Sequence, residues 1–197
     1  TQQSTPTTKN LLAVWGIDAK NVWAVGVSGT VLKWDGTTWT QLPTGTTASL
    51  SGVWGTSASD VWTVGENGVI LRWNGASWTQ ATALAGTTGL NAVWGSGARD
   101  VWFAGDGGLL LHFDGTTFTA STLSPAVGTV YGLWGSGASD LWAVGDSGTL
   151  LNYTGPSYTT SAQSGVVSTA GLRAVWGTSN SNVYAVGDNG TILHYLP

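Results

Sequence analysis

The sequence predicts an all-β fold, a five-bladed β-propeller of four-stranded antiparallel blades. One motif, Val/Leu-Trp-Gly, recurs five times in the 197 residues, at Trp15, Trp54, Trp94, Trp134 and Trp176. Successive copies are spaced by 39, 40, 40 and 42 residues, and a repeat of this length is typical of propeller blades. No stretch of the chain shows helical periodicity. The fold class therefore follows from one repeated unit that contains only strand signals.

Each repeat predicts four short strands, as its second copy illustrates. The first strand ends at Trp54, the second is 61–65, the third is 69–73, and the fourth begins at Trp78. These segments are rich in Val, Ile, Leu and Trp, which favour strands, and Asn-Gly, Asp-Gly and Ser-Gly pairs between them suit tight turns. Such a unit cannot bury both faces alone, so we expect several to stack around an axis. A β-solenoid is the rival fold, although its coils are usually shorter and carry fewer large aromatic residues.

We expect a single propeller domain spanning residues 1–197. Its blades are expected at about 11–43, 50–82, 90–123, 130–162, and 172–197 together with 1–6. The fifth copy stops after its third strand, and Thr1-Gln2 precedes Trp15 by the same 14 residues that separate Thr40-Gln41 from Trp54. Residues 1–6 are therefore predicted to pair beside 190–196 as the outer strand of the last blade, which leaves no open edge. The alternative is a piece of a longer array of repeats.

Composition excludes several classes of function. The net charge is −4 with only six Lys and Arg residues, so the basic surface that binds nucleic acid is absent. No apolar run approaches the ~20 residues that span a bilayer. Without cysteine, the chain has no disulfide and no thiolate metal site. The low charge and the abundance of Thr, Ser and Gly lead us to expect a secreted or cell-surface bacterial protein. We also expect a monomer, and a protein that uses no cofactor.

Most repeated polar residues are interpreted as structural. Asp60, Asp100 and Asp140 precede the second strand, and a short side chain that closes an Asx turn explains them. Asp35, Asn74 and Asp114 precede a glycine in the turn before the fourth strand and have the same explanation. His112 and His194 share one position with Lys33, Arg72 and Asn152. No metal site is predicted, because none of these sets has metal-ligand spacing.

A ligand site is expected where the repeats differ from one another. The second position of the first strand is occupied in turn by Leu12, Ser51, Asn91, Tyr131 and Arg173. The turns after the second strand, expected on the same face, carry Glu66, Asp106, Asp146 and Asp188, whereas Val27 breaks the pattern. A concave surface with a few convergent polar groups is typical of a ligand pocket. The alternative is that these are solvated turn residues around a wet channel.

Two stretches resemble known repeats. Residues 94–102, Trp-Gly-Ser-Gly-Ala-Arg-Asp-Val-Trp, and 190–195, Gly-Thr-Ile-Leu-His-Tyr, resemble the repeats of bacterial Asp-box (BNR-like) propellers. They are also similar to repeats of the photosystem-assembly-factor type. The turns 35–39 and 114–118 resemble a shortened Asp box. The resemblance covers nearly the whole chain and implies the propeller. Five-bladed relatives include tachylectin-like sugar-binding proteins and glycosidases, so it implies a tachylectin-like architecture.

A binding module is the preferred functional interpretation, and no catalytic residue is assigned. A glycosidase needs two carboxylates flanking the scissile bond, and the first strands, expected to line the axis, carry none. The chain is therefore predicted not to be an enzyme, with a glycosidase-like activity as the weaker alternative. A lectin would stack sugars on the fourth-strand aromatics, which are otherwise packing residues: Trp39, Trp78, Phe118 and Tyr158. A protein-interaction propeller would use Tyr131 and Arg173, residue types that anchor interfaces, and a purely structural repeat domain is the remaining possibility.

Overall fold

The structure is a computed structural model that describes residues 2–81, 86–123, 127–154, 159–161 and 169–196. The regular elements are strands and single 3-10 turns, as the repeat predicts. The chain divides into two compact units, Thr1–Val93 and Trp94–Pro197, and the boundary falls within one strand, β9 (Leu90–Gly97). Among the described residues, no helix is long and apolar enough to cross a membrane.

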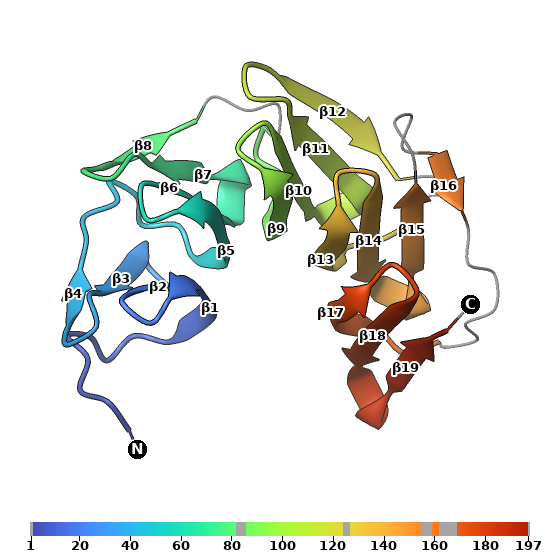
Figure 1. The fold of residues 1–197 in the computed structure, drawn as a ribbon, viewed down its shortest axis with the longest axis horizontal. Helices are drawn as coiled ribbons and strands as arrows, with labels where there is room; N and C mark the ends of the chain where they lie inside the picture. The colour runs from blue at the N-terminus through green and yellow to red at the C-terminus, as the bar shows by residue number, and fades with distance from the viewer. Residues whose placement is uncertain (1, 82–85, 124–126, 155–158, 162–168, 197) are drawn as a thin grey trace. The chain divides into compact units, whose positions relative to one another are not determined.

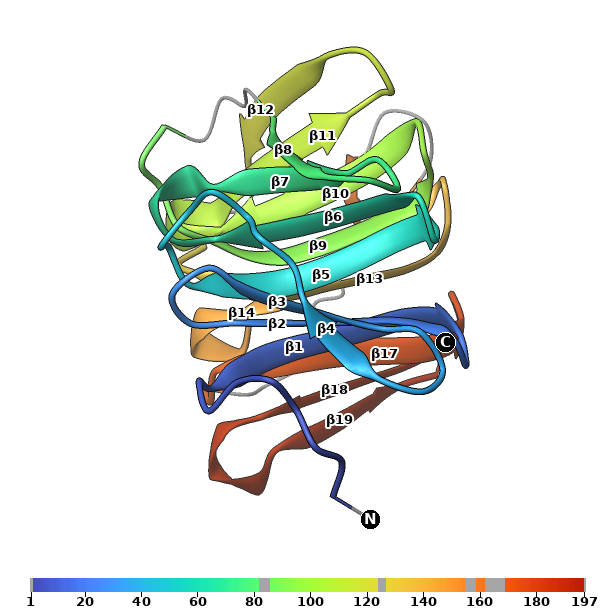
Figure 2. The same cartoon turned by 90° about the vertical axis from the view of Figure 1, so that its left-hand side faces the viewer.

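The first unit holds two four-stranded antiparallel sheets, each drawn from one repeat (Figures 1 and 2). The order in the first sheet is β1 (Leu11–Asp18), β2 (Asn21–Gly26), β3 (Thr30–Trp34) and β4 (Trp39–Gln41). The order in the second is β5 (Leu50–Ser57), β6 (Asp60–Gly65), β7 (Ile70–Trp73) and β8 (Trp78–Gln80). A 3-10 turn, η1 (Glu66–Gly68), links β6 to β7.

The second unit is built in the same way. One sheet has the order β12 (Phe118–Thr122), β11 (Leu109–Phe113), β10 (Asp100–Gly105) and β9, and the next has β13 (Val130–Gly137), β14 (Asp140–Gly145), β15 (Leu150–Thr154) and β16 (Thr159–Ser161). The last sheet has three strands, β17 (Leu172–Ser179), β18 (Asn182–Gly187) and β19 (Ile192–Tyr195). The turns η2 (Asp106–Gly108), η3 (Asp146–Gly148) and η4 (Asp188–Gly190) precede the third strands.

The register places the repeated aromatic residues opposite one another. Trp54 of β5 pairs with Trp62 of β6, and Trp134 of β13 pairs with Trp142 of β14. The glycine that ends the second strand lies against the start of the first strand. A Cβ on Gly65 would collide with the Ser49 carbonyl oxygen, so no larger residue fits there. The same close approach to a backbone carbonyl oxygen is found at Gly26, Gly145 and Gly187, which end the second strands of three other sheets.

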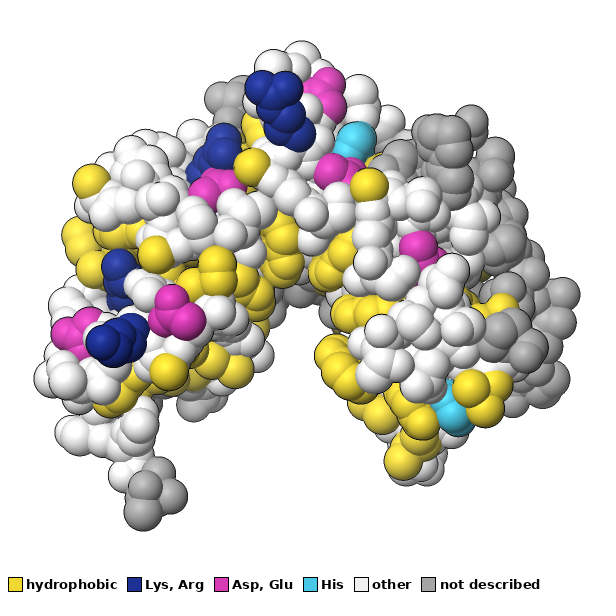
Figure 3. All heavy atoms as spheres, in the orientation of Figure 1, with side chains coloured by type: hydrophobic (Ala, Val, Ile, Leu, Met, Phe, Trp, Pro, Cys, Tyr) yellow, Lys and Arg dark blue, Asp and Glu magenta, His cyan; other side chains and the backbone are white. Residues whose placement is uncertain are grey.

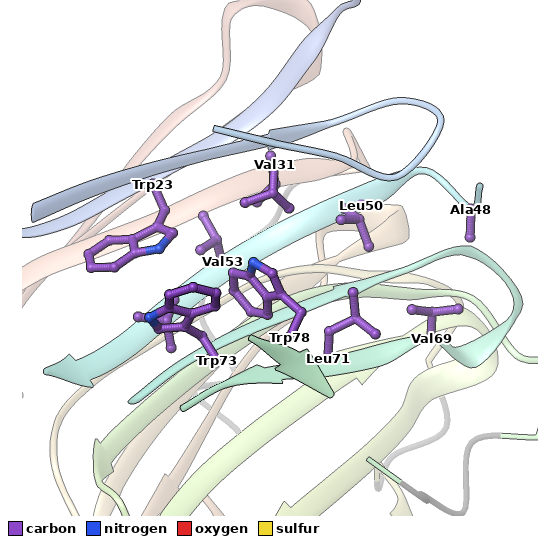
Figure 4. Close-up of a cluster of buried hydrophobic side chains, with 11 residues drawn as sticks. Trp23, Val31, Ala48, Leu50, Val53, Val69, Leu71, Trp73 and Trp78 are labelled. Atoms are coloured by element: carbon purple, nitrogen blue, oxygen red, sulfur yellow. The ribbon is translucent and has the colours of Figure 1, made fainter. Parts of the chain in front are cut away.

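Each unit has a core between neighbouring sheets. In the first unit, Trp23 and Val31 of one sheet face Val53, Trp73 and Trp78 of the next (Figure 4). A second cluster joins Trp102, Leu141 and Tyr153, and a third joins Trp142, Leu172 and Val183. The second-strand tryptophans Trp23, Trp62, Trp102 and Trp142 are therefore packing residues.

The predicted closure by the N-terminal segment is not found among the described residues. Residues 2–6 form no strand, and the last sheet has three strands. Instead, the Trp39 indole Nε1 donates a hydrogen bond of 2.8 Å to Gln3 Oε1. The segment lacks the leading aromatic residue that begins the other outer strands, and Pro6 has no N–H for a strand ladder. The N-terminal segment is therefore bonded to the first sheet through the side chains of Gln3 and Trp39.

Candidate functional site

The varied position of the first strands brings two side chains together in the second unit. Tyr131 of β13 and Arg173 of β17 lie on neighbouring strands, and the Arg173 guanidinium sits 4.3 Å from the centre of the Tyr131 ring. Arginine over an aromatic face is an attractive cation–π arrangement. The variable position of two first strands therefore carries two side chains, Tyr131 and Arg173, that contact each other.

Asp188 fixes the orientation of Arg173. Arg173 Nε donates to Asp188 Oδ1 at 2.9 Å, and Nη2 donates to Oδ2 at 2.6 Å, a bidentate pair. The hydrogen bond from Arg173 lowers the pKa of Asp188, and the same pair raises the pKa of Arg173. Both side chains stay nearly half exposed, at 48% and 42%. The guanidinium is thus held in one geometry while it remains accessible to a ligand.

Asp146 completes the group. Its Oδ2 accepts the backbone N–H of Thr129 at 2.9 Å. That bond, and then a hydrogen bond with the side chain of Tyr131, lower the pKa of Asp146. We call the set Tyr131, Asp146, Arg173 and Asp188 the Tyr131–Arg173 site. Its side chains are linked from Asp146 through Tyr131 and Arg173 to Asp188.

The other four predicted ligand residues lie on β5, η1, β9 and η2. In the first unit, Ser51 is half-buried in β5, and Asn91 is half-buried in β9. Glu66 Oε2 accepts the backbone N–H of Ser49 at 3.0 Å, so this carboxylate ties its turn to the start of β5. Asp106 is exposed at the start of η2. Glu66 and Asp146 each accept a backbone N–H group from the residue just before a first strand. An acidic residue at this turn therefore also stabilises the connection between the turn and that strand.

The fourth-strand aromatic residues are not equivalent. Trp78 is buried in the core of the first unit, and Phe118 packs 4.8 Å from Phe113. Tyr158 lies outside the described residues. Trp39 lines a pocket of about 460 Å³ with the N-terminal segment. We call this the Trp39 pocket, and its lining is Gln3, Ser4, Thr5, Pro6, Trp34, Thr37, Thr38 and Trp39.

The Asx-turn interpretation of Asp35, Asn74 and Asp114 is confirmed. Asp114 Oδ1 accepts the backbone N–H groups of Thr116 and Thr117 at 2.8 and 2.7 Å. These bonds, led by that of Thr117, hold the pKa of Asp114 below its usual range. Asp35 and Asn74 accept the equivalent N–H groups of their own turns. These residues therefore shape the turn.

Sequence reasoning missed a polar network that recurs between strands. Asp60 accepts hydrogen bonds from Thr56 Oγ1 at 2.6 Å and from Arg72 Nε at 2.7 Å. Asp140 likewise accepts from Ser136 Oγ at 2.8 Å and from Asn152 Nδ2 at 2.7 Å. The constant offset of 12 residues between the acid and its third-strand partner is the signal that could have revealed it.

One copy of this network contains Ser, His and Asp. Ser96 Oγ donates to Asp100 Oδ2, and His112 Nε2 lies 2.8 Å from Asp100 Oδ1. A hydrolytic triad places the histidine between the serine and the acid, because the histidine must take the serine proton. Here the carboxylate lies between the other two, so this geometry does not activate Ser96. Among the described residues, no group of three or more potential metal ligands is found.

Comparison with known proteins identifies the fold. No family model matches the chain, and no curated protein matches it. Among solved structures, it is similar to YCF48 bound to D1 peptide, with 21% identity, a TM-score of 0.70, and coverage of 98% of this chain and 65% of that one. It is similar to virginiamycin B lyase from Staphylococcus aureus, with 14% identity, a TM-score of 0.77, and coverage of 100% and 73%. It is also similar to the Cps50 (Swd1) β-propeller domain of Myceliophteria thermophila, with 10% identity, a TM-score of 0.75, and coverage of 98% and 67%.

These likenesses correct one expectation and support another. The prediction that the chain is not an enzyme is contradicted, because propellers of the same fold include a lyase. At 14% identity the likeness concerns the fold alone. The similarity to repeats of the photosystem-assembly-factor type holds at the level of the fold, since YCF48 is among the matches. The chain is an all-β protein with the repeat architecture of a β-propeller.

Proposed function

We propose that this chain is a protein-interaction β-propeller that binds a peptide segment of a partner at the Tyr131–Arg173 site. The observation that carries the proposal is the half-exposed Arg173 guanidinium, stacked 4.3 Å over Tyr131 and held by two bonds to Asp188. Tyrosine and arginine are enriched among the residues that dominate binding energy at interfaces. An arginine whose geometry is already fixed loses less conformational entropy on binding.

The chemistry of the site suits a peptide backbone or a carboxylate. Arginine has five N–H donors; the bonds to Asp188 use two of them, and a hydrogen bond with the side chain of Tyr131 uses another. Donors remain for carbonyl or carboxylate oxygens of a ligand, while the Tyr131 ring offers apolar area. The likeness to YCF48 bound to D1 peptide adds support from a protein of the same fold.

We expect Arg173→Ala to weaken peptide binding by about tenfold or more, as loss of an interface anchor does. A random peptide library displayed on phage is selected on the immobilised chain, and the enriched peptide is titrated against the variants by calorimetry. Tyr131→Ala should weaken binding as well.

Ser51→Ala is the matched control, because Ser51 occupies the same repeat position in the first unit. Its affinity for the peptide should stay unchanged. Equal affinities for Arg173→Ala and the unaltered chain, or a library that yields no binder, would contradict the proposal.

A second candidate function is carbohydrate binding at the Trp39 pocket. A partly exposed Trp39 lies beside the hydroxyl groups of Thr37 and Thr38, and an aromatic face with nearby hydrogen-bonding groups suits the two sides of a sugar. We expect the Trp39→Ala variant to bind a glycan found on an array about tenfold more weakly than the unaltered chain does. The Trp176→Phe variant should bind the same glycan with unchanged affinity. A blank array, or a hit indifferent to Trp39→Ala, would remove this candidate.

A further inference from the structure

The first sheet exposes apolar side chains at positions that later sheets cover more fully. Leu11 of β1 is 40% exposed, whereas its equivalents are fully buried: Leu50, Leu90, Val130 and Leu172. Val14 is 69% exposed, and its equivalent Val53 is 8% exposed. The same face is hollowed by an apolar pocket of about 370 Å³ that includes Leu12 and Ala24. Figure 3 shows hydrophobic side chains gathered on the surface of this unit.

The last sheet also has an exposed apolar face, formed by residues whose equivalents in the inner sheets are less exposed. Tyr184 of β18 is 39% exposed, whereas the tryptophans at the same repeat position are at most 4% exposed: Trp23, Trp62, Trp102 and Trp142. Ile192 of β19 is 70% exposed, and its equivalents Val31 and Ile70 are fully buried. Trp176 of β17 is 60% exposed. Exposed apolar area of this extent marks an interaction surface.

The inner repeats show what normally covers these faces. A Cβ on Gly177 would lie 2.7 Å from the ring of Trp134, so this tryptophan packs directly over the glycine of the following sheet. The ring of Trp94 lies over Gly135 in the same way. At these two junctions, a first-strand tryptophan packs over the first-strand glycine of the following sheet. Trp176 holds the position of Trp94 and Trp134 in the last sheet and is 60% exposed, and Gly16 holds the position of Gly135 and Gly177 in the first sheet.

We propose that the two open faces are blade–blade interfaces that take further blades of this same repeat. A following blade would present a first-strand glycine to Trp176. A preceding blade would present a first-strand tryptophan to Gly16 and cover Leu11 and Val14. Leu11 of the first sheet, and Tyr184 and Ile192 of the last sheet, hold positions that the inner sheets bury, so the occupant is defined by its repeat motif.

The length of similar propellers supports this occupant. The chain spans 65%, 73% and 67% of the three propellers compared above. Five of seven equal repeats would be about 71% of a chain, since repeat proteins grow by whole units. A second copy of the chain is a weaker occupant, because a head-to-tail contact between copies leaves two faces open again unless the rotation closes.

The test lengthens the chain by eight strands and asks whether a neighbouring blade comes to cover Trp176. One extension places a copy of residues 74–153 after Tyr195, so that the added sequence supplies an outer strand, one complete repeat and the first three strands of another. A second extension uses residues 35–113, so that the result does not depend on one choice of repeats. Trp176→Ala is made in both extended chains and in the 197-residue chain, and thermal unfolding is followed by circular dichroism.

We expect Trp176→Ala to lower the Tm of an extended chain by about 6 °C or more, because the ring would lose its packing against the neighbouring blade. In the 197-residue chain, the same change should move the Tm by about 2 °C or less, as at an exposed position. A large loss in the 197-residue chain would overturn the proposal, because the face would already be covered. Sedimentation would then tell closure within one chain from pairing of two copies. Equal, small losses in both extended chains would overturn it as well.

Discussion

Replacing Trp142 with Ala is expected to lower the free energy of unfolding by about 3–5 kcal/mol, the range for removing a large buried aromatic residue. Trp142 is 1% exposed in the core of the second unit and packs with Val144, Leu172 and Val183. Its ring centre lies 5.0 Å from that of Tyr195. Its indole Nε1 has no hydrogen-bond partner among the described residues, so the loss comes from apolar burial and the cavity left behind.

Tyr184→Ala is the matched control for Trp142→Ala. Tyr184 holds the same repeat position in the last sheet but is 39% exposed and stacks on His194 at 3.9 Å. Its removal should cost about 1 kcal/mol or less in urea unfolding followed by circular dichroism. Similar losses of stability for the two variants would contradict the claim that burial of Trp142 stabilises the second unit.

Replacing Asp140 with Ala is expected to cost about 2–3 kcal/mol, because it removes the shared acceptor of a buried network. Asp140 is 6% exposed and accepts hydrogen bonds from Ser136 Oγ, Ser136 N and Asn152 Nδ2. The loss of one carboxylate therefore deprives donors on two other strands of their partner. Denaturant unfolding of the variant measures this cost.

Asn182→Ala tests whether burial sets the cost of losing Asp140. Asn182 occupies the equivalent position in the last sheet, where it contacts Thr178 Oγ1 at 2.8 Å and His194 Nε2 at 2.8 Å in exposed surroundings. Water can replace those bonds, so we expect a loss of about 1 kcal/mol or less. A larger loss for Asn182→Ala than for Asp140→Ala would contradict this account of the network.

The strands were predictable because one pattern recurs and each copy confirms the others. The Val-Trp-x-Val-Gly segments are β2, β6 and their equivalents, and the Asx-Gly turns bind their own backbone as short polar side chains do. Comparing repeats also singled out Tyr131 and Arg173, since a residue that varies where its neighbours do not is free of the common packing role.

The remaining features depend on neighbours that a single repeat does not specify. Trp39 and Trp78 share one repeat position, yet Trp78 is buried and Trp39 lines a pocket with the N-terminal segment. The sequence treats them alike, because accessibility is set by what packs on each sheet. The bonds from Arg72 to Asp60 and from Asn152 to Asp140 were missed because each residue, taken alone, suits a solvated turn or a polar slot.

The measurement that tests the central claim most directly is amide hydrogen exchange of the chain with and without the peptide enriched by phage selection. The account predicts added protection at the starts of β13 and β17, around Tyr131 and Arg173, and at the turn that begins with Asp188. Protection confined to other strands, with these three segments unchanged, would contradict the Tyr131–Arg173 site as the place where this propeller binds.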